Sequence, residues 1–106
     1  MKLPPVVKAY FEADRGEDAD AFARIFSRNA VVTDEGRTYE GIEAIRAWWL
    51  DAKEKYHHVA QPLEMTETGD LISVRAQVHG QFPSSPARLE FVFTLENDKI
   101  VALEIV

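Results

Sequence analysis

The sequence predicts an α+β fold in which three helices cover one face of an antiparallel sheet. In most of the first half of the chain, apolar residues recur at the spacing of helices. In the second half, apolar and polar residues alternate over long segments that turn-forming dipeptides separate. Helices followed by a run of strands indicate helices gathered on one face of an antiparallel sheet. We expect a single domain over residues 1–106, because the chain has 106 residues and 46% hydrophobic content.

Three segments have the spacing and the end signals of helices. Residues 4–14 begin with two prolines, which the first turn of a helix tolerates. The second helix takes Asp18 as its N-cap and is expected to end near Asn29. The third and clearest helix opens at Gly41. Their apolar stripes consist of Val6, Val7, Tyr10 and Phe11, of Phe22, Ile25 and Phe26, and of Ile42, Ile45, Trp48 or Trp49, Ala52 and Tyr56.

The remaining segments read as strands. Residues 30–33 are expected to form a strand that the turn Asp34-Glu35-Gly36 joins to a short strand near Thr38-Tyr39. A strand over residues 58–67 leads through the hairpin turn Gly69-Asp70 to the alternating segment LISVRAQVHGQF. After the loop FPSSP, the segments ARLEFVFTLE and KIVALEIV are the last two strands, and Asn97-Asp98 turns between them.

The last two strands carry apolar residues on both faces. In LEFVFTL the residues Leu89, Phe91, Phe93 and Leu95 share one face, but Val92 on the other face is apolar too. A sheet that helices cover on one side only should be polar on the other. We therefore expect the outer face to pack against a second copy of the chain, as a homodimer.

Composition excludes several classes of function. Twelve basic and 18 acidic residues give a net charge of −6 without a basic cluster, which argues against nucleic-acid binding. No cysteine is present, and His57, His58 and His79 lack ligand spacing, so we expect neither a metal nor another cofactor. No apolar run is long enough for a signal peptide or a membrane span. The expectation is a cytoplasmic protein with no membrane partner.

The segment FARIFSRNAVVTDEGRTYEGIEAIRAWW resembles the nuclear transport factor 2-like (NTF2-like) superfamily, specifically its SnoaL-like and ketosteroid-isomerase-like branch. The resemblance extends over nearly the whole chain. It implies a cystatin/NTF2-like cone, in which three helices lie in a strongly curved, mainly antiparallel sheet around a mostly apolar pocket. It also implies dimerisation through the outer face of the sheet. It does not fix the activity, because one fold carries many functions.

The same resemblance implies three catalytic candidates. Tyr10 stands at the position of a hydrogen-bonding tyrosine, Asp34 at that of the proton-shuttling carboxylate, and Glu90 at that of a protonated carboxylic acid. Removal of a proton next to a carbonyl group needs a base near the carbon and donors near the oxygen. Glu90 is one methylene longer than the aspartate of the isomerases, and no proline follows Asp34, so a bulky steroid is not the expected substrate.

Each candidate also has a structural interpretation. Tyr10 lies in an apolar stripe and fits a core position. Asp34 opens a turn, a position that aspartate favours. Glu90 is buried and paired or protonated if its face is concave, and is a solvated charge if it lies at the edge of the sheet.

Further candidates for contact with a ligand are Trp48, Trp49, Tyr39, Val92 and Leu103. The two adjacent tryptophans lie about 100° apart on their helix, so one can pack on the sheet while the other lines the pocket. The expected partner is a small hydrophobic molecule. The first hypothesis is a cofactor-free isomerase-like, or lyase- or hydrolase-like, catalyst acting on a small hydrophobic carbonyl compound with Asp34 as base. The alternatives are a binding module without chemistry and a dimerisation domain whose pocket is too small for any ligand.

Overall fold

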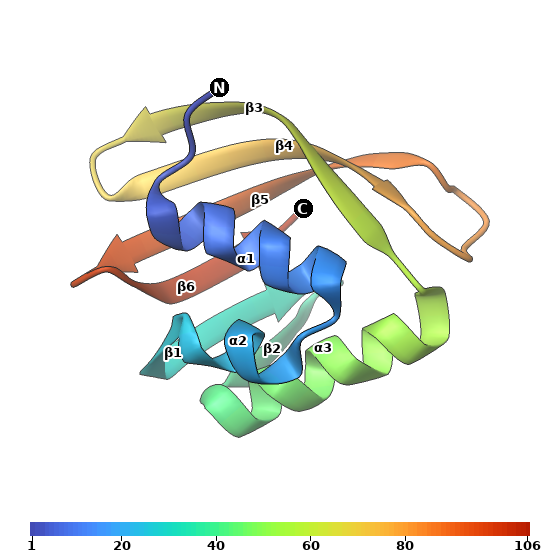
Figure 1. Ribbon diagram of the computed structural model, residues 1–106, viewed down its shortest axis with the longest axis horizontal. Helices are drawn as coiled ribbons and strands as arrows, with labels where there is room; N and C mark the ends of the chain where they lie inside the picture. Colours follow the sequence, from blue (N-terminus) through green and yellow to red (C-terminus); the bar gives the residue numbers. More distant parts are fainter.

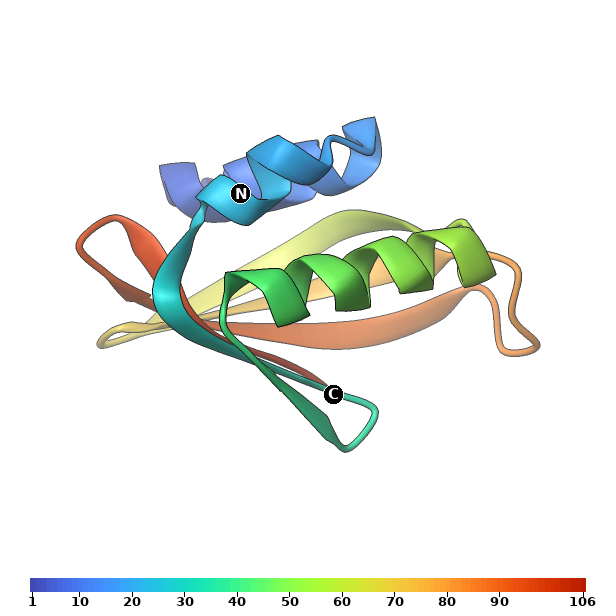
Figure 2. The same ribbon diagram turned by 90° about the horizontal axis from the view of Figure 1, so that it is seen from below.

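The computed structural model describes all 106 residues and has three helices on one side of a single sheet. The helices are α1 (Pro5–Gly16), α2 (Ala19–Arg24) and α3 (Ile42–Tyr56). Figures 1 and 2 show α1 and α3 lying over the same concave side of the bent sheet. The predicted α+β architecture, with helices gathered on one face, is therefore confirmed.

Six strands form the sheet in the order β2-β1-β6-β5-β4-β3. Their bounds are β1 Phe26–Asp34, β2 Arg37–Glu40, β3 Val59–Thr68, β4 Leu71–His79, β5 Ala87–Glu96 and β6 Lys99–Ile105. All neighbours are antiparallel except β1 and β6, which run parallel. The last strand thus joins the hairpin from the first half of the chain to the meander from the second half.

The second helix is shorter than predicted. Asp18 is its N-cap and accepts a hydrogen bond from the Ala21 amide at 3.0 Å, but the helix ends at Arg24. Phe26 already belongs to β1, and Asn29 lies inside that strand and is not a helix end. The apolar stripe that suggested the longer helix contains only three residues. So short a pattern does not distinguish the end of a helix from the start of a strand, because Phe26 would be buried in both.

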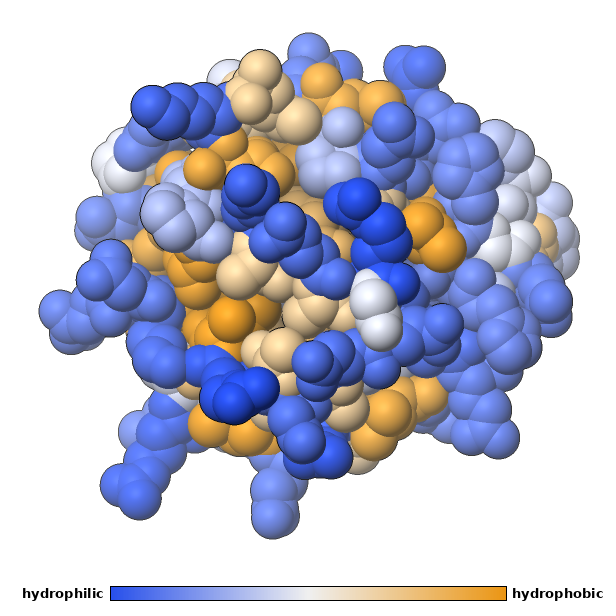
Figure 3. Space-filling model, in the orientation of Figure 1, coloured by the Kyte–Doolittle hydropathy of each residue, from blue (hydrophilic) through white to orange (hydrophobic).

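The core between the helices and the sheet is rich in aromatic side chains. Its fully buried residues include Phe11, Phe22, Phe26 and Phe93, and Trp49 stacks on Phe22 with ring centres 4.6 Å apart. From β4 the core takes Ile72, Val74, Ala76 and Val78, which are the four residues that the alternating pattern placed on one face. In the space-filling view, apolar residues show through the middle of the face that carries α1, surrounded by hydrophilic side chains (Figure 3).

The outer face of the sheet is more polar than the sequence indicated. An irregular register between β5 and β6 pairs Thr94 with Ala102 but Leu95 with Ile100, so that Ile100 and Leu103 are both buried although they are three residues apart. This bulge accounts for part of the apolar excess that suggested a covered outer face. A homodimer through this face stays a prediction, and sedimentation at micromolar concentration would test it.

No helix in the structure has both the length and the apolar character needed to cross a membrane.

Candidate active site

A cavity of about 550 Å³ lies where α1 and α3 meet the sheet near the C-terminal end of α3. Its walls come from α1, the β1–β2 turn, α3, the start of β3, the end of β4, the β4–β5 loop, the first half of β5 and the end of the chain. Twelve of its 18 lining residues are hydrophobic, so the cavity suits a ligand that is mostly apolar. The few polar groups that reach it therefore decide what it can do. They belong to Tyr10, Asp14, Asp34, Glu35, Trp48, Tyr56, His58 and Ser84.

Tyr10 is a buried residue of the core and also lines the cavity. Its ring packs among Phe11, Phe22 and Phe93, with ring centres 5.1–5.2 Å away. No group of the protein forms a hydrogen bond with its hydroxyl. Burial raises the pKa of this phenol well above its usual value, and the charges of Asp14 and Asp34 raise it further. Tyr10 therefore stays protonated and keeps a hydrogen-bond donor available to a ligand.

Asp34 ends β1 and is only partly buried. Its Oδ2 accepts a hydrogen bond of 3.1 Å from the indole Nε1 of Trp48. Burial raises the pKa of this carboxyl, and the neighbouring Glu35 adds to the rise; the hydrogen bond from Trp48 opposes both without cancelling them. A carboxylate with a raised pKa at the wall of an apolar cavity is suited to accept a proton from carbon.

A second carboxylate, Asp14, lies at the wall of the same cavity and is 2% exposed. Its Oδ1 accepts hydrogen bonds from Trp49 Nε1 at 2.8 Å and from His58 Nε2 at 3.0 Å, and Lys53 Nζ lies 3.4 Å away. Burial raises the pKa of this carboxyl, but the hydrogen bond and charge of His58, with the contributions of Trp49 and Lys53, outweigh it, so the pKa is lowered. Lys53 also donates a hydrogen bond to the backbone carbonyl of His58. Oδ2 of Asp14 is buried without a hydrogen-bond partner.

Glu90 does not lie at the cavity, which corrects the expectation for this residue. Its neighbours Leu89 and Phe91 line the cavity, and alternation along β5 therefore directs Glu90 to the outer face. There its carboxylate accepts hydrogen bonds from Ser73 Oγ at 2.6 Å and from Arg75 Nε at 3.2 Å. The hydrogen bond from Ser73 is the main reason that the pKa of Glu90 is lowered and not raised. Glu90 is therefore not a protonated donor to a ligand.

Of the five residues expected to contact a ligand, only Trp48 lines the cavity. Trp49 is buried in the core, and its indole N–H donates a hydrogen bond to Asp14. Leu103 is buried in the core, and Tyr39 packs on Trp48 with ring centres 5.9 Å apart. Val92 pairs with Ser73 and Glu104 on the outer face, for the same reason of alternation that applies to Glu90.

Asp14 and His58 are two bonded polar residues of the cavity that sequence reasoning did not assign to the site. Asp14 follows Tyr10 by four residues and Phe11 by three, so it shares the buried face of α1. A carboxylate on the apolar stripe of a helix was the signal that could have found it. His58 lies immediately before β3, two residues ahead of the buried Ala60, and both residues line the cavity.

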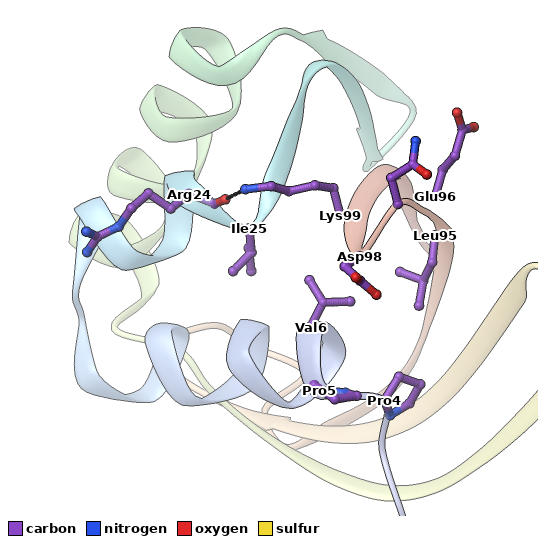
Figure 4. A pocket seen from close by; sticks show the side chains of 10 residues that line it. Pro4, Pro5, Val6, Arg24, Ile25, Leu95, Glu96, Asp98 and Lys99 are labelled. Carbon is purple, nitrogen blue, oxygen red and sulfur yellow. Dashed lines mark hydrogen bonds between the residues drawn. The ribbon is translucent and has the colours of Figure 1, made fainter.

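A second hollow of about 700 Å³ lies at the other end of α1, between its first turn, the end of α2 and the β5–β6 turn. Figure 4 shows the side chains of Val6, Ile25 and Leu95 directed toward it, and Lys99 Nζ bound to the Arg24 carbonyl. Only three of its ten lining residues are hydrophobic, and none of its carboxylates is buried. We place the candidate active site in the first cavity for this reason. No three His, Cys, Asp or Glu side chains are arranged to hold a metal ion in either place.

A family model described as the SnoaL-like domain matches residues 7–103, so the chain belongs to the SnoaL-like family. No curated protein matches the sequence. The chain is similar to a protein of Sinorhizobium meliloti named "putative polyketide cyclase", with 46% identity over 98% of this chain and 95% of that one, and a TM-score of 0.97.

Two more distant structures show the fold alone. One is a protein of Catenulispora acidiphila with a ketosteroid isomerase-like fold, solved in complex with trimethylamine. It is 18% identical over 99% of this chain and 86% of that one, with a TM-score of 0.87. The other is an NTF2-like protein of unknown function from Cytophaga hutchinsonii. It is 17% identical over 100% of this chain and 93% of that one, with a TM-score of 0.78. The predicted NTF2-like, ketosteroid isomerase-like fold is thereby confirmed.

Proposed function

We propose that the protein is a cofactor-free acid–base catalyst that removes a proton next to the carbonyl group of a small hydrophobic compound. Asp34 is the base in this proposal, and the Tyr10 hydroxyl donates a hydrogen bond to the oxygen on which negative charge develops. The observation that carries it is that both groups line one largely apolar cavity, Asp34 with a raised pKa and Tyr10 with an unused donor.

The relative from Sinorhizobium meliloti supports the same type of reaction. It is named as a polyketide cyclase, although only as a putative one, and it is 46% identical over almost the whole chain. Closing a ring by joining two carbons of a polyketide requires a carbon next to a carbonyl group to lose a proton. The base and the donor proposed here supply what that step needs, whether a double bond then moves or a ring closes.

The size of the cavity argues against one alternative, the dimerisation domain without chemistry. A dimerisation domain without chemistry requires a pocket too small for a ligand, whereas about 550 Å³ lies within the range of about 300–1,000 Å³ that is common for ligand sites. A binding module without chemistry stays as the second candidate. It is favoured by the position of Glu90, which leaves the site without the second carboxylic acid of the isomerases.

Hydrogen exchange at carbon tests the proposal directly. In D₂O the protein should speed up the exchange of the α-hydrogens of benzylacetone, a small aryl ketone, as followed by proton NMR. Asp34→Asn keeps the shape of the side chain and an acceptor for Trp48 but removes the base. It should lower the catalysed rate by about 10²–10⁴-fold, the usual contribution of a general base.

Glu90→Gln is the matched control, because it makes the same chemical change outside the cavity and should leave the rate unchanged. Exchange that is equally fast with Asp34→Asn would remove Asp34 as the base. Binding of benzylacetone without any catalysed exchange would favour the binding module.

A further inference from the structure

The cavity carboxylates Asp14 and Asp34 belong to two separate hydrogen-bonded sets, and the proposed function uses only Asp34. Asp34 comes from the end of β1 and is held by Trp48. Asp14 and His58 come from the last turn of α1 and from the residue just before β3, and they form a bonded pair at the same cavity. Proton removal from carbon by Asp34 requires neither Asp14 nor His58.

The pair has the arrangement of a proton-transfer residue with a partner that orients it. The His58 ring is 18% exposed, and its Nε2 donates to Asp14 Oδ1 at 3.0 Å. Nδ1 has no hydrogen-bond partner in the protein, and this atom is accessible to solvent. A carboxylate on one ring nitrogen fixes the orientation of an imidazole and stabilises its charged form, which leaves the other nitrogen to exchange a proton with a ligand.

The rest of the protein holds this pair firmly. Trp49 donates to the same oxygen of Asp14 at 2.8 Å, and Lys53 lies 3.4 Å from it while also donating to the His58 carbonyl. Lys53 is itself 7% exposed. Burying a carboxylate together with three cationic or N–H partners costs desolvation free energy. Apolar residues at these positions would fill the same space without that cost, so packing alone does not explain the charged group.

We propose that His58 is a second proton-transfer residue of this site and that the substrate is a carbonyl compound with a hydroxyl group on the β-carbon. The inference rests on the proposed function. A double-bond shift needs only one carboxyl group, because the base that removes the proton can return it to another carbon. Two separate proton-transfer residues are needed when one group takes a proton from carbon while another protonates an oxygen that leaves.

The step is an elimination of water. The Asp34 carboxylate takes the α-hydrogen, and the electron pair of that C–H bond forms the new carbon–carbon double bond. The bond from the β-carbon to its hydroxyl oxygen breaks, and this oxygen takes a proton from His58 as it leaves. The products are an α,β-unsaturated carbonyl compound and water. The proton on Asp34 then returns to His58 through solvent, which restores both groups.

Two probes separate the inference from the proposed function. Benzylacetone reports on proton removal alone, through hydrogen exchange. The aldol adduct of benzaldehyde and acetone has the same carbon skeleton with a β-hydroxyl group, and its dehydration gives a conjugated enone that absorbs in the near ultraviolet. Wild type should exchange the first compound and dehydrate the second.

His58→Gln keeps an N–H donor for Asp14 but cannot deliver a proton to the substrate. It should lower the dehydration rate by about 10²–10⁴-fold, well beyond any change in the exchange of benzylacetone by the folded variant. The matched control is His79→Gln on the exposed outer face, which should affect neither reaction. In a His58→Ala variant, added imidazole should restore part of the dehydration, which a purely structural role of His58 would not produce.

Exchange without dehydration in wild type, or dehydration that His58→Gln leaves intact, overturns the inference and spares the proposed function. If His58→Gln loses both reactions and melting shows that it is unfolded, rescue of His58→Ala by imidazole decides, and absence of rescue overturns the inference. A wild type that catalyses neither reaction overturns both proposals.

Discussion

Asp14 and Asp34 line the same cavity, and each accepts an indole N–H from one of two consecutive tryptophans of α3, yet their environments act in opposite directions. Trp49 donates to Asp14 and Trp48 to Asp34. The pKa of Asp14 is lowered although it is the more deeply buried of the two, and the pKa of Asp34 is raised. Depth of burial therefore does not decide which carboxylate is charged.

The difference comes from the groups around each carboxylate. His58 and Lys53 surround Asp14 and favour its charged form, whereas Asp34 has the negative Glu35 beside it and only one N–H donor from a side chain. Two carboxylates at one cavity can thus have separate roles, one as a fixed negative charge and the other as a group that exchanges protons.

Loss of the carboxylate should cost far more at Asp14 than at Asp34. Asp14→Ala leaves the buried Lys53 ammonium without its counterion and Trp49 without an acceptor, which should lower the free energy of unfolding by about 3–5 kcal/mol. Asp34→Ala, the matched control, removes one partly buried hydrogen bond and should cost much less. Denaturation in urea measures both values, and equal losses would contradict the separation of roles.

The two tryptophans should differ in the same direction. Trp49→Phe removes a donor from a buried carboxylate and alters the stack on Phe22, so we expect a loss of about 1–3 kcal/mol. Trp48→Phe removes a bond at a partly buried position and should cost about 0.5–1.5 kcal/mol. It should also raise the pKa of Asp34 further, because the N–H that favours the charged form is gone. A larger loss for Trp48→Phe would reverse the comparison.

The smallest effect is on how stability depends on pH. The folded-state pKa of Asp34 lies above its unfolded value, so the stabilisation from this group is complete below the unfolded pKa and is lost as pH rises through the folded pKa. Asp34→Asn removes this loss, so its stability relative to wild type should be higher at neutral pH than in acid. Asp14 has the opposite sign, because its stabilisation is lost as pH falls through its lowered pKa. Urea denaturation at several pH values measures the first difference, and one of opposite sign would contradict the raised pKa of Asp34.

The fold could be predicted from the sequence to a large extent because it depends on patterns that are local. The alternation of LISVRAQVHGQF assigned every buried residue of β4, and Gly41 marked the start of α3 correctly. The end of α2 could not be predicted, since Ile25 and Phe26 are apolar in either a helix or a strand. The bulge between β5 and β6 could not be predicted either, because it depends on the register between two strands.

The candidate site was predictable only where the resemblance or the period pointed to it. Tyr10, Asp34 and Trp48 do line the cavity, but the role of Glu90 was transferred by position although the alternation of Leu89 and Phe91 directs it outward. Asp14 was missed because its burial depends on Lys53 and His58, which lie 39 and 44 residues further along the chain. A buried charge becomes acceptable only when its partners are known, and periodicity does not supply them.

A carbon-13 NMR titration of the side-chain carboxyl groups in the wild-type protein reads out the difference between Asp14 and Asp34 without any substitution. Asp14 should titrate below the usual range for aspartate and Asp34 above it. Titration of Asp34 at or below the position of Asp14 would contradict this order, and Asp34 could then no longer be assigned as the base.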